Sequence, residues 1–163
     1  MNPEFGALIV EVRTSGIHGQ GVFAARNIAA GERIGVYAGR RYEPGNHLEV
    51  ANDNELTYVF ALSDGRSIDG AQGGNATAHL NHSCEPNCNA VEEVDRAGQL
   101  QIVFEALVPI ASGAELFIDY ALQLEPGDKG KYQCLCRRPR CRGSMAEVVA
   151  RSRRRAKPAT SKS

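Results

Sequence analysis

Residues 74–88 read Gly-Asn-Ala-Thr-Ala-His-Leu-Asn-His-Ser-Cys-Glu-Pro-Asn-Cys, and the organisation of the chain follows from this stretch. It holds two cysteines, two histidines and four residues that are asparagine or proline, with few apolar side chains. Burial alone cannot fix so polar a segment, so turns, side-chain hydrogen bonds or a metal ion must contribute. We expect Asn75 to cap a short helical turn that runs to Leu80. A surface loop with unrelated cysteines is the alternative that this stretch leaves open.

Three further cysteines lie about fifty residues downstream, where Cys134, Cys136 and Cys141 follow the spacing C-x-C-x4-C. Three thiolates at this spacing are one ligand short of a tetrahedral zinc site, and Cys84 or Cys88 can supply the fourth sulfur. The chain has five cysteines and no secretory signal pattern, which favours metal binding or free thiols over a disulfide framework. Reduced thiols on a basic loop remain the alternative.

The net charge of zero hides a division of the chain into an acidic body and a basic end. Residues 1–127 carry 7 Arg and Lys against 17 Asp and Glu, a balance of −10, whereas residues 128–163 carry 12 against 2, a balance of +10. This division favours either association of the body with its own tail or attraction of the body for basic ligands, although a solvated acidic surface with an unrelated tail fits the charges equally well. No apolar run approaches the roughly 20 residues that a membrane span needs, so we expect no membrane association.

Short apolar runs separated by glycine-containing turns predict a mainly β fold of one domain. Ser63-Asp64-Gly65-Arg66 and Ala97-Gly98 are hairpin signals. A short helix near residues 48–51 and a terminal helix over residues 145–156 are also predicted. The expected strands are residues 8–12, 22–24, 33–38, 57–62, 67–69, 89–94, 100–104 and 115–118.

Two other motifs are weak when each is taken alone. Gly19-Gln20-Gly21 is an ordinary turn, and a strand that ends in Asp119-Tyr120 is usually core or edge packing. The order in which all the motifs occur is far more specific. The ordered set comprises Ser-Gly-Ile-His-Gly-Gln-Gly (15–21), Val-Tyr-Ala-Gly (36–39), Ser-Ile-Asp-Gly (67–70), Gly-Asn (74–75), Asn-His-Ser-Cys-Glu-Pro-Asn-Cys (81–88), Glu-Leu-Phe-Ile-Asp-Tyr (115–120) and the downstream cysteines.

From about Ala7 to Gly143 this set resembles the SET-domain protein-lysine methyltransferases that carry a post-SET zinc segment, in the minimal form seen in bacteria. The resemblance implies small curved β-sheets with few short helices, in which residues 81–88 cross residues 115–120 in a knot-like arrangement. It also implies three parts: a SET domain over residues 7–125, a post-SET zinc-binding segment over residues 126–145, and a basic tail over residues 146–163 that is partly helical or disordered.

The resemblance assigns candidate site residues. Tyr120 and Tyr37 are the expected catalytic residues, and Cys84 is the expected fourth ligand of one structural zinc ion, which leaves Cys88 as a buried thiol. The implied S-adenosylmethionine contacts are His18, Gly19, Gln20, Gly21, Tyr37, Asn81, His82 and Leu135. The implied lysine channel is formed by Tyr58, Phe60, Ala90, Ile118 and Tyr120, and the metal ligands are Cys84, Cys134, Cys136 and Cys141.

Some positions differ from the family pattern. Ala78-His79 stands where Arg-Phe is common, and His79 reads as a structural substitute. Ile118 occupies a channel position at which family members often carry Phe or Tyr, and Ala90 occupies one at which some members carry Tyr. Neither has a hydroxyl, so we expect a channel with room for more than one methyl group.

The implied activity is methylation of lysines in basic proteins such as histone tails or bacterial nucleoid proteins. Lys157 and Lys162 in the basic tail are possible self-substrates. One alternative is a non-catalytic SET-like interaction module, and another is a zinc-dependent nucleic-acid-binding protein that uses its basic tail. We expect the protein in the cytoplasm or nucleoid of a bacterium, or in a nucleus if it is eukaryotic or a secreted effector.

Overall fold

The computed structural model describes residues 9–46, 58–124, 127, 130 and 132–147 of the 163-residue chain. Short strands dominate this part, and it contains no α-helix, which confirms the mainly β prediction. No helix in these ranges is long and apolar enough to cross a membrane. The elements are β1 (Val10–Thr14), β2 (Gln20–Ala24), β3 (Arg33–Val36), β4 (Arg40–Tyr42), β5 (Val59–Ala61), β6 (Ser67–Asp69), the 3-10 helix η3 (Ala76–His79), β7 (Asn81–His82), β8 (Cys88–Val94), β9 (Leu100–Ala106) and β10 (Glu115–Ile118).

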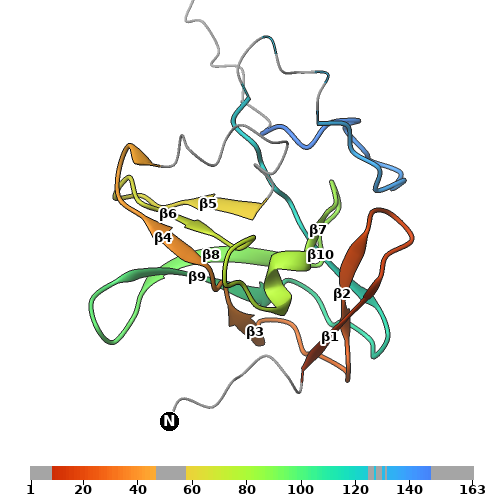
Figure 1. The fold of residues 1–163 in the computed structure, drawn as a ribbon. Coiled ribbons are helices and arrows are strands. Elements are labelled where there is room, and N and C mark those ends of the chain that lie inside the picture. Colours follow the sequence, from red (N-terminus) through yellow and green to blue (C-terminus); the bar gives the residue numbers. More distant parts are fainter. Residues whose placement is uncertain (1–8, 47–57, 125–126, 128–129, 131, 148–163) are drawn as a thin grey trace, which may run out of the picture.

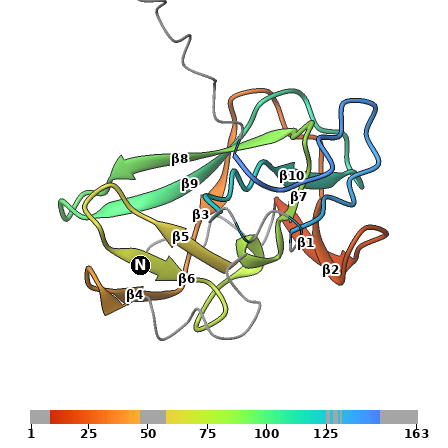
Figure 2. The ribbon, with the colours of Figure 1, turned by 90° about the horizontal axis from the view of Figure 1, so that it is seen from above.

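The strands form three small sheets with the orders β1-β2-β10-β7, β3-β9-β8 and β4-β6-β5. Figure 1 shows β8 and β9 as a long hairpin beside the β4-β6-β5 sheet, with β1, β2, β7 and β10 at the other side of the molecule. Figure 2 gives the same division from above, with the segment that contains residues 132–147, drawn in blue, next to β7 and β10.

Both predicted hairpins are present. Gly65 and Gly98 have φ of 86° and 80°, a left-handed conformation that glycine adopts at little cost. An aspartate completes each turn, since Asp64 Oδ1 accepts the Arg66 N–H at 3.0 Å and Asp95 Oδ1 accepts the Ala97 N–H at 2.8 Å. The hairpins are therefore fixed by local turn chemistry.

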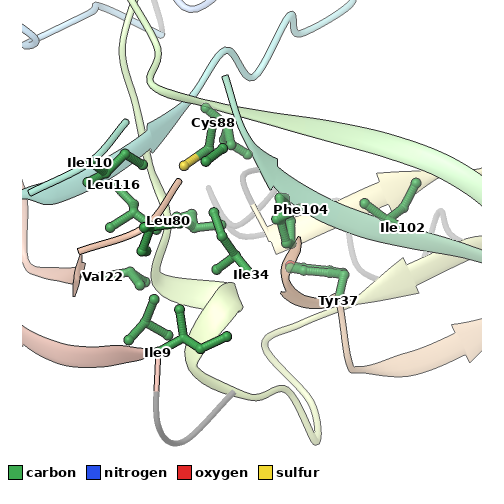
Figure 3. Close-up of a cluster of buried hydrophobic side chains, with 14 of the residues drawn as sticks. Ile9, Val22, Ile34, Tyr37, Leu80, Cys88, Ile102, Phe104, Ile110 and Leu116 are labelled. Carbon is green, nitrogen blue, oxygen red and sulfur yellow. The ribbon is translucent and has the colours of Figure 1, made fainter. Parts of the chain in front are cut away.

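The core lies between the sheets and is made of side chains from elements far apart in the sequence. Val22, Phe104 and Leu116 have no exposed surface. Figure 3 shows Leu80 and Ile34 between Val22 on one side and Phe104 on the other. Burial of one such side chain contributes about 1.5–3 kcal/mol, so this cluster is a main source of stability.

Residues 74–88 have the structure that their polar composition requires. Asn75 caps η3, because its Oδ1 accepts the Thr77 N–H at 3.1 Å. Further along, β7 pairs in parallel with β10, with Asn81 opposite Phe117 and His82 opposite Ile118. The expected contact between this segment and the strand that leads to Tyr120 is thus present.

The Asn87 side chain forms a second contact between residues 74–88 and β10. Its Nδ2 donates to the Glu115 carbonyl at 2.9 Å, and its Oδ1 accepts the Phe117 N–H at 2.8 Å. A side-chain amide presents one donor and one acceptor in the same arrangement as a peptide group, so Asn87 substitutes for a strand partner at this point.

Two sequence predictions differ from the structure. Residues 40–42 are not among the predicted strands, since they begin a polar stretch without a clear period, yet they form β4, which pairs with β6. The helix predicted over residues 145–156 is wrong at its start, because Ala146 forms a parallel bridge with Leu122 and its surroundings are extended. Residues 148–156, and the helix predicted at residues 48–51, lie outside the described ranges.

Replacement of Asn87 by alanine tests the role of its side chain in the crossing. Asn87→Ala removes both hydrogen bonds and leaves the Glu115 carbonyl and the Phe117 N–H without this partner, so we expect a loss of about 2–4 kcal/mol in the free energy of unfolding. Denaturant unfolding followed by circular dichroism measures it. The matched control is Asn89→Ala on β8, where the side chain is exposed and a change within about 0.5 kcal/mol is expected. Equal effects of the two substitutions would contradict this role of Asn87.

Candidate active site and cysteine cluster

A cavity of about 300 Å³ opens beside the crossing and is lined mainly by apolar and aromatic side chains. Four of the predicted site residues line it: Tyr37, Phe60, Ile118 and Tyr120. Tyr37 and Phe60 pack edge to face with a centroid separation of 4.7 Å, so one wall of the cavity is a rigid aromatic pair.

Two tyrosine hydroxyls are fixed by backbone carbonyls at this cavity. The Tyr120 hydroxyl donates to the Leu80 carbonyl at 2.6 Å, and the Tyr37 hydroxyl donates to the Tyr58 carbonyl at 2.5 Å. Since each hydroxyl hydrogen is already donated to a carbonyl, the hydroxyl oxygen can only accept a further hydrogen bond. A guest that donates hydrogen bonds, such as an amine, fits this arrangement.

Neither phenol is suited to act as a base or as a phenolate at neutral pH. Burial raises the pKa of Tyr37 and of Tyr120 well above the ordinary tyrosine value. Both groups therefore remain protonated and act through hydrogen bonding and position.

Asn81 joins the turn at residues 18–21 to the crossing. Its Nδ2 lies 3.3 Å from the His18 carbonyl, 3.0 Å from the Gln20 carbonyl and 3.0 Å from Glu115 Oε1. A Cβ on Gly21 would meet Glu115 Oε1 at 2.2 Å, so any other residue at position 21 would displace the Glu115 carboxylate from this place beside Asn81. The structure thus brings the predicted residues His18, Gln20, Gly21 and Asn81 together.

The remaining predicted residues lie elsewhere. Tyr58 lines a second hollow of about 440 Å³ together with Ala78 and His79, and Ala78 also borders the first cavity. The unusual Ala78-His79 pair therefore lies where the two hollows adjoin. Ala90, opposite Phe104 in the β8–β9 ladder, and Leu135, 47% exposed, are not among the residues that line either hollow.

Four cysteines converge at the end of β7, and we call them the cysteine cluster: Cys84, Cys134, Cys136 and Cys141. Their sulfur atoms all lie within 4.8 Å of one another, and those of Cys84 and Cys134 are 3.5 Å apart. Zn–S bonds of about 2.3 Å in a tetrahedron place the sulfurs about 3.8 Å apart, so the cluster fits a zinc ion.

Backbone donors favour the thiolate form that a metal requires. The N–H groups of Arg142 and Gly143 point at the sulfurs of Cys84 and Cys141, at 3.3 and 3.4 Å. Burial raises the pKa of Cys84 and of Cys134 above the ordinary thiol value despite these donors. Burial acts in the same direction on Cys136, but hydrogen bonds from backbone N–H groups and from neighbouring thiols outweigh it and lower that pKa to about 6. The donor set therefore suits zinc in chemistry as well as in spacing.

Cys88 lies apart from the cluster, within the hydrophobic core. It is 1% exposed, and burial raises the pKa of its thiol to about 12. A neutral thiol in this setting behaves as a small hydrophobic side chain.

His82 links the cysteine cluster to Tyr120. The Tyr120 N–H donates to His82 Nδ1 at 3.0 Å, and His82 Nε2 lies 3.5 Å from Cys84 Sγ. Since Nδ1 accepts, the proton of the neutral ring is on Nε2. Burial lowers the pKa of His82 and outweighs the nearby charge of Asp119, which by itself would raise it. The imidazole is therefore neutral at neutral pH, and the 3.5 Å approach of Asp119 Oδ1 to Nδ1 is not an ion pair.

Asp119 and Arg142 form a contact that the sequence motifs did not reveal. Both guanidinium Nη atoms of Arg142 donate to the Asp119 carboxylate at 2.9 Å, in a bidentate pair. Partial burial alone raises the pKa of Asp119, but the bonds from Arg142 outweigh it and the pKa lies below its ordinary value. The only sequence feature that singles out Arg142 is its place directly after Cys141, and that place does not indicate Asp119 as its partner.

Metal analysis of cysteine variants tests the zinc site. We expect one zinc ion per chain, and a loss of that ion in Cys84→Ser, because three sulfurs bind zinc much more weakly than four. Cys88→Ser is the matched control, since its sulfur is in the core, and it is expected to retain the metal. Measurement by atomic emission on purified protein decides the question, and an equal loss of zinc in both variants would contradict the assignment of Cys84.

Comparisons with known proteins agree with this geometry. The family model described as SET domain matches residues 19–121. The chain is 34% identical over 136 residues to a Saccharomyces cerevisiae "Histone-lysine N-methyltransferase, H3 lysine-4 specific", covering 80% of this chain and 12% of that protein. It is 40% identical over 138 residues to human "Histone-lysine N-methyltransferase 2B", covering 82% of this chain and 5% of that protein.

A solved structure gives the same picture. The fold matches "ctPRC2 in an autoinhibited conformation bound to S-adenosylmethionine" with a TM-score of 0.63 and 27% identity, over 69% of this chain and 15% of that one. The family match, the three small sheets and the C-terminal cysteine cluster lead to one conclusion. The chain belongs to the SET domain family.

Proposed function

We propose that the protein is an S-adenosylmethionine-dependent protein-lysine methyltransferase with histone-like basic substrates. The observation that carries the proposal is the apolar cavity at which Tyr37 and Tyr120 each hold an acceptor oxygen. Family membership, the histone-lysine methyltransferases among the relatives, and the bound S-adenosylmethionine of the ctPRC2 structure support it.

The cavity suits a lysine side chain. Methyl transfer needs a neutral amine, whereas a free lysine has a pKa of about 10.4. Walls such as Phe60 and Ile118 disfavour the charged ammonium and promote loss of its proton, so a strong general base is not required. The Tyr120 oxygen then accepts a hydrogen bond from the amine and orients its lone pair.

S-adenosylmethionine supplies a methyl group on a positively charged sulfur, which is displaced in line by a nucleophile. In this proposal the turn at residues 18–21, with Asn81 and His82, holds the cofactor, and Leu135 adds a contact from the cysteine segment. Tyr37, Phe60, Ile118 and Tyr120 shape the lysine channel, and Tyr58 contributes from the adjoining hollow. Ala90 lines neither hollow, so its proposed part in the channel is limited to its small size. Most of the rate enhancement then comes from positioning.

The proposed substrate follows from charge as well as from the relatives. Residues 1–127 have a balance of −10, which attracts a basic peptide such as a histone tail or a segment of a bacterial nucleoid protein. Such substrates place the enzyme in the nucleus of a eukaryotic cell or on the nucleoid of a bacterium. We also propose the division into a SET domain (7–125), a post-SET segment (126–145) and a basic tail (146–163).

The rival reading is a non-catalytic module that keeps the fold for protein interaction. Retention of Tyr37, Asn81, His82 and Tyr120 in the sequence favours the enzyme, and so do the two fixed hydroxyls at the cavity, because a module needs no such pair. A zinc-dependent nucleic-acid-binding protein is less favoured, since the body is acidic and direct binding is left to the basic tail.

Substitution of Tyr120 tests the activity. We expect Tyr120→Phe to lower methyl transfer to histone and nucleoid-protein mixtures by about 100-fold or more, because the acceptor oxygen is lost. Binding of S-adenosylmethionine, measured by calorimetric titration, should change little. The control is Tyr42→Phe on β4. The Tyr42 hydroxyl accepts a hydrogen bond from Gln72 Nε2 and Tyr42 does not line the cavity, so this variant should retain full activity.

An inactive wild-type protein that still binds a basic peptide would favour the interaction module. Activity of Tyr120→Phe equal to that of Tyr42→Phe would remove Tyr120 from its proposed role.

The side chain at position 118 tests the number of methyl groups transferred. Ile118 lines the cavity and has no hydroxyl to restrain the amine, so we propose that the wild-type enzyme forms di- or trimethyl-lysine. Ile118→Tyr should shift the product toward monomethyl-lysine, as measured by mass spectrometry of the peptide over a time course. A wild-type product that never exceeds one methyl group would contradict the proposal.

The same spectra report on methylation of the chain itself. The tail has Lys157 and Lys162 in a basic context, and we propose that either is a self-substrate or competes with the peptide. A variant shortened after residue 147 is the control, because Ala146 and Glu147 pair with Leu122 and must be kept. If the tail carries no methyl groups and the shortened variant has unchanged turnover, the tail is neither a self-substrate nor a competitor of the peptide.

A further inference from the structure

Arg142 connects the cysteine cluster to the residues on either side of Tyr120. Its backbone N–H donates to Cys84 Sγ at 3.3 Å, so the cluster holds its main chain. Its side chain reaches Asp119, the residue before Tyr120, with two bonds of 2.9 Å. One residue thus spans from a metal-ligand sulfur to the neighbour of the proposed catalytic tyrosine.

The turn that Asp119 begins has an unusual backbone. Ala121, the residue after Tyr120, has φ of 45°, a left-handed conformation that alanine rarely adopts. Asp119 Oδ1 accepts the Ala121 N–H at 3.0 Å and thereby holds this conformation. Because Ala121 also lines the cavity, a change in the turn alters both the wall and the direction of the Tyr120 side chain.

The cysteine segment also holds the chain directly beyond the turn. The Leu122 N–H donates to the Met145 carbonyl at 3.0 Å, and the Glu147 N–H donates to the Leu122 carbonyl at 2.9 Å. Arg142 Nη2 reaches the Ala146 carbonyl at 3.3 Å, so its guanidinium lies between the turn and this short pairing. Residues 119–122 are therefore supported on one side by residues 142–147.

We propose that Arg142 is a positioning residue for Tyr120, through which the cysteine segment sets the rate of methyl transfer. The guanidinium holds Asp119, Asp119 holds the turn through Ala121, and the turn directs the Tyr120 hydroxyl to the Leu80 carbonyl at the cavity. The planar fork of arginine matches the two carboxylate oxygens, which a lysine ammonium cannot do. The inference rests on the proposed function, since it names a residue that supports the same site.

The first experiment compares Arg142→Met with Arg140→Met. Both remove an arginine from the cysteine segment, but no hydrogen bond of the Arg140 side chain is present among the described residues, where its backbone N–H alone bonds to Glu85. We expect Arg142→Met to lower kcat by about 10- to 100-fold, the scale on which a misplacement of about 1 Å acts. KM for both substrates and the zinc content should stay within about twofold, and Arg142→Lys should restore only part of kcat.

A spectroscopic measurement separates position from general stability and needs no substrate. The five tyrosines can be labelled as 3-fluorotyrosine, and the ¹⁹F resonance of Tyr120 is assigned by its loss in Tyr120→Phe. We expect this resonance to shift or broaden in Arg142→Met and to stay in place in Arg140→Met. Wild-type kcat together with an unmoved resonance in Arg142→Met would overturn the proposal.

Asp119→Asn keeps the test decisive if Arg142→Met loses zinc or does not fold. This variant changes nothing in the cysteine segment, and its amide oxygen can still accept the Ala121 N–H. Reduced kcat with a shifted Tyr120 resonance is expected, and the double variant should be no slower than the slower single variant. Fully additive losses, or a folded, zinc-loaded Asp119→Asn protein with wild-type kcat and resonance, would overturn the proposal. If the wild-type protein transfers no methyl group, the proposed function fails while the ¹⁹F comparison still decides the coupling.

Discussion

The parallel pairing of β7 with β10 is the interaction on which the rest of the site depends. It comprises two residue pairs, Asn81 with Phe117 and His82 with Ile118, and Asn87 extends it through a side-chain amide. This short contact aligns the Asn81 amide with the turn at residues 18–21 and brings His82 beside Tyr120. It also sets Cys84 at the end of β7, within reach of the three downstream cysteines.

The site combines apolar walls with a few fixed polar atoms, and each part depends on the other. Burial keeps the phenols of Tyr37 and Tyr120 protonated, and the carbonyls that accept their hydrogen bonds determine where their oxygens face. In water these hydroxyls would exchange partners freely. Inside the cavity each hydroxyl has one carbonyl partner, which is the form of preorganisation that the proposed reaction without a strong base needs.

Much of the fold and of the site could be predicted from the sequence. Glycine-containing turns located both hairpins, and the order of the motifs indicated that residues 81–88 meet the strand before Tyr120. The choice between Cys84 and Cys88 could not be made from spacing. The choice depends on which of the two side chains faces the core at the crossing. In the structure Cys88 is buried in the core, and Cys84 lies with the other three sulfurs. The Asp119–Arg142 pair could not be predicted for a similar reason, since ion pairs between distant segments leave no periodic pattern in the sequence. Strand β4 was missed because Arg40 and Arg41 look like loop residues, although their backbone pairs with β6.

The four-stranded sheet also determines when the site can form. β2 pairs with β10 through residues 22–23 and 115–116, and the cysteine cluster takes one sulfur from residue 84 and the others from residues 134–141. Contacts between such distant segments close large loops, and folds built on them form slowly. A chain that has left the ribosome only as far as β9 has neither β10 nor the downstream cysteines. Such a chain contains Tyr37 and Cys84 but lacks Tyr120 and the other three cysteines, so neither the pair of hydroxyls nor the four-sulfur cluster can be complete before residues 115–141 are in place.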